Sequence, residues 1–113
     1  IKTGPETVRG ADVLYYSYER LPRGEAVPKG FHSVAPDLVV EVKSPSDRWG
    51  ELFVKVGEYL HTGVRVVVVV DPETCSASVY RFDEIQQIYH NGDELTLPDV
   101  LPGFAVKVSR LFA

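Results

Sequence analysis

A carboxylate and an ammonium stand two residues apart in the middle of this 113-residue chain, in Glu41-Val42-Lys43. The surrounding residues 38–43 are otherwise apolar, which predicts a strand buried in a sheet. Side chains two residues apart on a strand lie on one face, so the two charges share a face. Because unpaired buried charges are costly, the pair is either a salt-bridged edge or a functional site, and both interpretations stay open.

The functional interpretation is metal-dependent hydrolysis of a phosphodiester. A glutamate at the end of a central strand can hold a divalent cation, while a neighbouring lysine stabilises or deprotonates the attacking water. Magnesium takes oxygen ligands from more than one segment, which predicts a second carboxylate on an adjacent strand. Asp12, in the β-prone residues 11–18, is the best candidate, although it could instead accept hydrogen bonds in a turn.

Four blocks follow one another along the chain: Val8-Arg9-Gly10-Ala11-Asp12-Val13, residues 36–46, Lys55-x-x-Glu58-Tyr59-x-x-x-Gly63-Val64, and Val70-Asp71-Pro72. Together they resemble the Uma2 family of restriction endonucleases, within the PD-(D/E)xK nuclease superfamily. The resemblance covers nearly the whole chain. It implies one nuclease-like domain over residues 1–113, and we expect this domain to lack the N-terminal helical segment and first strand that family members usually carry.

The resemblance also implies roles for individual residues. Asp12 and Glu41 would be the metal carboxylates, with the Val42 carbonyl as a further oxygen ligand of Mg²⁺ or Mn²⁺. Lys43 would be the catalytic lysine, and the lysine that the family places regularly at position 55 would join it. Lys55 also follows Glu51 by four residues, so an exposed ion pair on a helix is an equal alternative.

Asp37 belongs to the literal Pro-Asp pair of the chain, but the family's motif aspartate corresponds to Asp12. An even number of residues separates Asp37 from Glu41 and Lys43, so on one strand the three side chains would project from the same face. Four residues span roughly 13 Å along a strand, however, so we expect it to contribute indirectly at best.

Charge weighs against tight DNA binding by this chain alone. The net charge is -4, and the residues through Tyr59 hold eight basic and nine acidic side chains, so no basic face is expected. The alternative to a DNA endonuclease is therefore a non-catalytic binding or dimerisation module. We expect homo-oligomers through an exposed strand edge. A single cysteine, no apolar run of about 18 residues and no signal-peptide pattern favour the cytoplasm.

The pattern of elements predicts a mixed α/β fold of the restriction-endonuclease type, with a central sheet, one crossover helix and a C-terminal β extension. Ser46 or Asp47 should cap a helix that ends at Gly63. Its apolar stripe, including Trp49 and Phe53, favours core packing over base stacking. The strands on either side of this helix should be parallel neighbours. The expected segments are strands 11–18, 38–43, 64–70, 76–82, 85–90 and 94–97, and a loop at 19–33.

Overall fold

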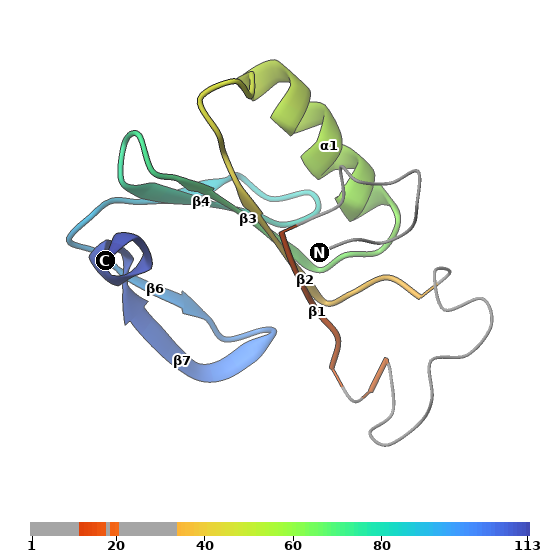
Figure 1. Ribbon diagram of the computed structural model, residues 1–113. Coiled ribbons are helices and arrows are strands. Elements are labelled where there is room, and N and C mark those ends of the chain that lie inside the picture. Colours follow the sequence, from red (N-terminus) through yellow and green to blue (C-terminus); the bar gives the residue numbers. More distant parts are fainter. Residues whose placement is uncertain (1–11, 18, 21–33) are drawn as a thin grey trace.

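A five-stranded mixed sheet forms the centre of the computed structural model, which describes residues 12–17, 19–20 and 34–113 (Figure 1). The strands follow one another across the sheet in chain order. Among the described strands, only β2 and β3 run parallel, and α1 connects them. The expected parallel neighbours and the mixed α/β class are therefore confirmed. The strands are β1 (Val13–Tyr15), β2 (Leu38–Val42), β3 (Val66–Asp71), β4 (Ser76–Tyr80) and β5 (Gln87–Tyr89).

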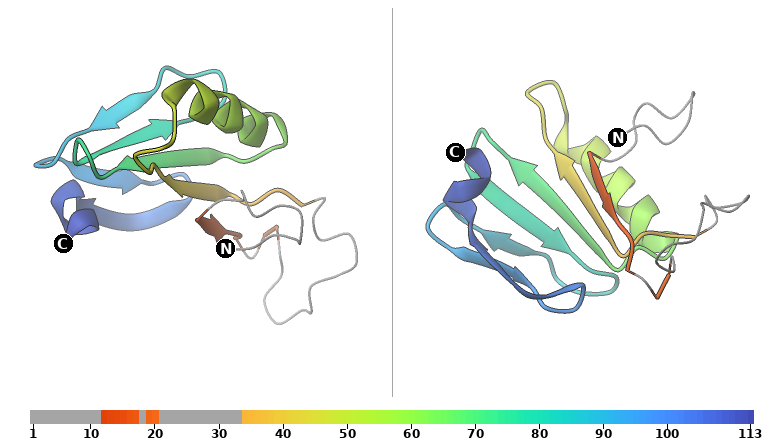
Figure 2. Two further views of the ribbon diagram at one scale, coloured as in Figure 1. Left: turned by 45° about the horizontal axis from the view of Figure 1, so that its top comes forward. Right: turned by 60° about the horizontal axis from the view of Figure 1, so that its bottom comes forward.

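Different elements cover the two faces of this sheet, as the views in Figure 2 show. Helix α1 (Trp49–His61) packs on one face. A second, two-stranded sheet of β6 (Glu94–Leu97) and β7 (Leu101–Lys107) covers the other, followed by a 3₁₀ helix at Val108–Phe112. The molecule thus has three layers, with the five-stranded sheet in the middle.

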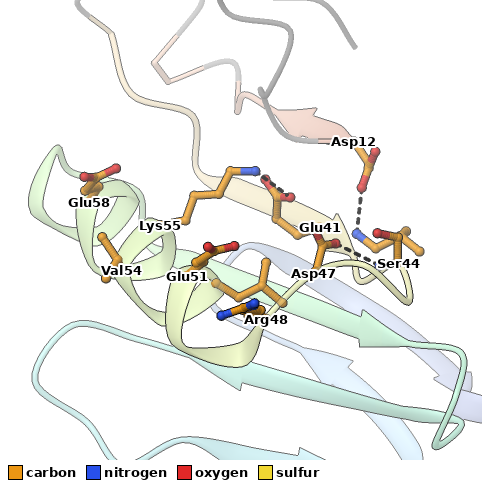
Figure 3. A pocket seen from close by; sticks show the side chains of 11 residues that line it. Asp12, Glu41, Ser44, Asp47, Arg48, Glu51, Val54, Lys55 and Glu58 are labelled. Atoms are coloured by element: carbon orange, nitrogen blue, oxygen red, sulfur yellow. Dashed lines mark hydrogen bonds and ion pairs between the residues drawn. The ribbon is translucent and has the colours of Figure 1, made fainter.

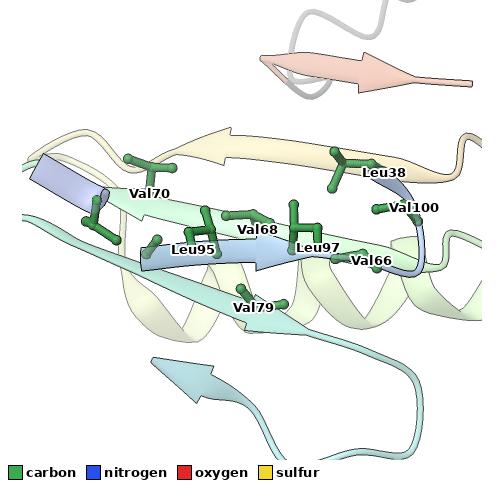
Figure 4. Close-up of a cluster of buried hydrophobic side chains, with 10 residues drawn as sticks. Leu38, Val66, Val68, Val70, Val79, Leu95, Leu97 and Val100 are labelled. Atoms are coloured by element: carbon green, nitrogen blue, oxygen red, sulfur yellow. The ribbon is translucent and has the colours of Figure 1, made fainter. Parts of the chain in front are cut away.

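Strand β3 is buried along its whole length because both of its faces are covered. Val66, Val68 and Val70 point to the β6–β7 side, where Leu95 and Leu97 meet them (Figure 4). Val67 and Val69 point to the α1 side and pack with Leu52 and Val56 of the helix. The consecutive valines of β3 therefore pack into two hydrophobic cores, one on each face of the sheet, as expected for a strand covered on both faces.

The two ends of α1 differ in how well the sequence predicted them. At the start the expected capping is wrong: Arg48 is the N-cap residue, without a side-chain cap, and the Asp47 carboxylate instead accepts the Ser44 N–H at 2.8 Å. At the end, Gly63 adopts φ +107°. The N–H groups of Gly63 and Val64 donate to carbonyls of the last turn, at 3.1 and 3.2 Å, in a Schellman arrangement that requires a residue with positive φ.

Strand limits differ from the expected ones by one to three residues, except for β6, which matches the expected segment 94–97. The parallel pair ends at residue 42 in β2 and at residue 71 in β3, and β4 and β5 are shorter than expected because the chain turns between them. Strand β7 was not predicted. For the first strand, residues 11 and 18 lie outside the described part, as does most of the expected loop at 19–33. No helix among the described residues is long and apolar enough to cross a membrane.

Candidate functional site

Asp12 and Glu41 line the same cavity from neighbouring segments. Asp12 lies just before β1, and its N–H donates to the Val40 carbonyl at 3.1 Å, beside the antiparallel pair of Val13 and Val40. Glu41 lies on β2 and points to the α1 side, where Lys55 and Tyr59 of the helix contact it.

Glu41 is a buried carboxylate that both of its described partners reach from α1. Its side chain is 5% exposed. Lys55 Nζ lies 3.2 Å from Glu41 Oε1, and the Tyr59 hydroxyl donates to Oε2 at 2.9 Å. The three side chains meet because Lys55 and Tyr59, four residues apart, share one face of the helix.

The hydroxyl of Tyr59 stays protonated well above neutral pH. Burial, the hydrogen bond to Glu41 and the negative charges of Glu41, Asp12 and Glu58 all raise the pKa of this phenol above its usual value. Tyr59 therefore acts as a neutral donor that holds one oxygen of Glu41 in place.

Asp12 is tied to the main chain of β2. Its Oδ2 accepts the Val42 N–H at 2.6 Å. The N–H and C=O of one strand residue point to the same side, so the Val42 carbonyl also points towards β1 and Asp12. Oxygen atoms of Asp12, Glu41 and Val42 thus lie at the same end of the sheet, where β2 ends and β1 begins.

These residues open onto a cavity of about 890 Å³ between β2 and α1 (Figure 3). Five acidic and two basic side chains line it, so its wall is negative overall. Among them, Asp47 has its pKa held below the usual range by the Ser44 N–H and by the charges of Lys55 and Lys43. The lining residues are Asp12, Glu41, Val42, Ser44, Asp47, Arg48, Glu51, Leu52, Val54, Lys55 and Glu58.

Lys43 occupies a neighbouring hollow rather than this cavity. Its ammonium lies over the Trp49 ring, 5.7 Å from the centroid, and its side chain is 8% exposed. The hollow measures about 300 Å³ and also holds Asp71, which the β2–β3 register places beside Lys43. The described cation against Glu41 is therefore Lys55 and not Lys43.

Contacts bear on two further residues. Lys55, for which an exposed ion pair with Glu51 was one of two alternatives, pairs with Glu41 instead. Asp37 lies at the opposite end of β2 from the cavity, where it is 1% exposed and binds Arg20 and Arg65.

Tyr59 is the site residue that sequence reasoning missed. Its half-buried ring joins the apolar stripe of the helix. Its spacing of four from Lys55 was the available signal, because that spacing puts both polar ends on one face of the helix.

The donor set suits a hard divalent cation. Mg²⁺ binds through one or two carboxylates with waters and phosphate oxygens completing the shell, and the oxygens of Asp12, Glu41 and Val42 supply such a set. Within the described residues, no group of three His, Cys, Asp or Glu side chains is arranged to hold a metal ion. Any cation here would therefore rely on water or substrate for several ligands.

Comparison with known proteins gives a family and a fold. The family model Uma2, described as "Putative restriction endonuclease", matches residues 1–109. A solved structure from Anabaena variabilis ATCC 29413, titled a "putative nuclease belonging to DUF820", superposes with a TM-score of 0.69 at 19% identity. The match covers 86% of this chain and 55% of that one, so the chain spans about half the length of its neighbour. No curated protein matches.

Proposed function

The chain belongs to the Uma2 family, and from this membership and its cavity we propose that it hydrolyses phosphodiester bonds in DNA with a bound Mg²⁺ or Mn²⁺ ion. The observation that carries the proposal is that the carboxylates of Asp12 and Glu41 line one accessible cavity. Two carboxylates that share a cavity can hold a divalent cation there.

Asp12, Glu41 and the Val42 carbonyl would hold the cation. When bound, the ion would neutralise phosphate charge and lower the pKa of its water. The buried position of Glu41 limits competition from bulk solvent, and the Tyr59 hydroxyl fixes the direction of its carboxylate.

Lys43 and Lys55 would have different roles in the reaction. Lys43, two residues after Glu41 and just past the end of β2, would orient the attacking water or take its proton. Its ammonium lies over the Trp49 ring in the neighbouring hollow and would have to turn from there towards the ion. Lys55 lines the cavity and would contact the substrate phosphate.

A non-catalytic binding or dimerisation module is the second candidate. The acidic wall of the cavity favours it, because phosphate backbones bind where positive charge dominates. The two functions differ in their metal requirement: a nuclease needs the ion to offset this wall, whereas a protein-binding module does not.

Calorimetric titration with Mg²⁺ and Mn²⁺, paired with cleavage of supercoiled and linear DNA, tests the proposal. Glu41→Gln keeps the shape of the side chain and its acceptor for Tyr59 but removes the charge, so metal binding and cleavage should both be lost. Glu58→Gln is the matched control, since Glu58 lines the same cavity from an exposed position. Equal metal affinity in the two variants would refute Glu41 as a ligand.

Lys43→Ala separates ligand from catalytic roles. It removes a cation near the ion and spares both carboxylates, so cleavage should disappear while metal affinity stays equal or rises. If Lys43→Ala and Glu41→Gln give the same titration curves on a folded background, the assigned roles are wrong.

A further inference from the structure

We propose that Lys55 and a divalent cation compete for the Glu41 carboxylate, so that cation binding releases the Lys55 ammonium for the substrate phosphate. The inference rests on the proposed function and adds an order of events to it. In the metal-free protein Lys55 would pair with the Glu41 carboxylate, and it would reach the substrate phosphate only after the ion has bound.

The contacts of Glu41 carry the first step. Each carboxylate oxygen already has a partner, Lys55 Nζ at 3.2 Å on Oε1 and the Tyr59 hydroxyl at 2.9 Å on Oε2. A cation bound to Glu41 would stand close to both. Tyr59 is neutral and can keep its hydrogen bond, but the ammonium would repel a dication at contact distance. Lys55 is therefore the partner that must leave.

The surroundings of the two partners agree with this choice. The Lys55 side chain is 28% exposed and lines the cavity, so it can turn without disturbing the core. Tyr59 packs against the core under α1 and cannot move as easily. Asp47, whose carboxylate already feels the charge of Lys55, lines the same cavity and offers the released ammonium a nearby partner.

The competition also explains how a buried carboxylate is tolerated without metal. An unpaired charge at 5% exposure is strongly destabilising, and the lysine neutralises it. The same residue would then serve folding in the metal-free protein and substrate binding in the loaded one.

Metal affinity of Lys55→Gln tests the proposal. Removing the competing cation should tighten Mn²⁺ binding at least about fivefold in calorimetry, an effect that simple loss of structure cannot produce. Arg48→Gln is the control, because it removes the same charge from the lining of the same cavity. It should change the affinity by less than about twofold if long-range repulsion is screened by salt.

The outcomes separate this inference from the proposed function. If both variants tighten binding equally, or if Lys55→Gln does not tighten it, the competition is refuted while the metal site stands. If neither the wild type nor either variant binds Mn²⁺, the proposed function fails, and the competition fails with it.

A measurement on the wild-type protein covers the case in which Lys55→Gln does not fold. Amine labelling followed by mass spectrometry reports how free each lysine is. Adding Mg²⁺ should increase labelling of Lys55 and leave the exposed Lys107 on β7 unchanged. Unchanged or decreased labelling of Lys55 at saturating Mg²⁺ would overturn the proposal.

Discussion

Replacing Asp37 with alanine should remove the buried carboxylate that binds the Ser17 N–H, just after β1, and two arginine side chains. The Asp37 carboxylate is 1% exposed. Its Oδ2 accepts the Ser17 N–H at 2.7 Å, and its Oδ1 lies 3.2 Å from Arg20 Nε and 3.3 Å from an Arg65 nitrogen. Asp37→Ala therefore leaves one amide and two guanidinium groups without their shared acceptor.

The size of the effect follows from how exposed these partners are. Removing one member of a buried ion pair costs about 3–5 kcal/mol. The side chains of Arg20 and Arg65 are 28% and 44% exposed and can turn to water. We therefore expect the free energy of unfolding to fall by a smaller amount, about 2–3 kcal/mol. At about 4 °C per kcal/mol for this chain length, the melting temperature should fall by roughly 8–12 °C.

Thermal unfolding followed by circular dichroism measures this loss, with Asp93→Ala as the matched control. Asp93 also accepts one backbone N–H at 2.7 Å, from His90, but it is exposed. Removal of the Asp93 carboxylate should lower the free energy of unfolding by about 1 kcal/mol or less. If the two variants lose equal stability, burial and the arginines contribute nothing at Asp37, and the reasoning is refuted.

Four other outcomes are expected. Val67→Asp places an unpaired charge at a 0% exposed position and should abolish cooperative unfolding in circular dichroism, whereas Val54→Asp, at a 63% exposed helix position, should unfold cooperatively. Gly63→Ala, at φ +107°, should lower stability in urea by about 1–2 kcal/mol, while Gly57→Ala in open space on α1 should raise it by up to about 1 kcal/mol; the reverse order would contradict the assigned helix end. Burial would raise the pKa of Asp37, but the Ser17 hydrogen bonds and the two arginines outweigh burial and lower that pKa. The Asp37 carboxylate therefore stabilises the fold fully above about pH 4, and this stabilisation is lost as the pH falls through the lowered pKa of the folded state. Acid titration of Asp37→Ala should lack that loss. Finally, the protein should self-associate, and light scattering that finds a strict monomer at high concentration would argue against it.

The sequence alone determined the features that depend on local periodicity. The run of valines at residues 66–70 is typical of a strand covered on both sides, and β3 is covered by α1 on one side and by β6 and β7 on the other. Gly63 marked the end of α1 because few other residues adopt a positive φ. The order strand, helix, strand led to the parallel β2–β3 pair, since such crossovers join neighbours in one sheet.

Only the tertiary structure decided which charges meet. Glu41 is paired with Lys55 and Tyr59 of α1, and Lys43 instead lies over Trp49. These partners depend on how the helix docks across the sheet, which is set by the packing of its buried side chains against the valines. The placement of Asp12 and Glu41 in one cavity likewise depends on the pairing of β1 with β2, and neither strand register nor helix docking is encoded in the spacing of residues along one element.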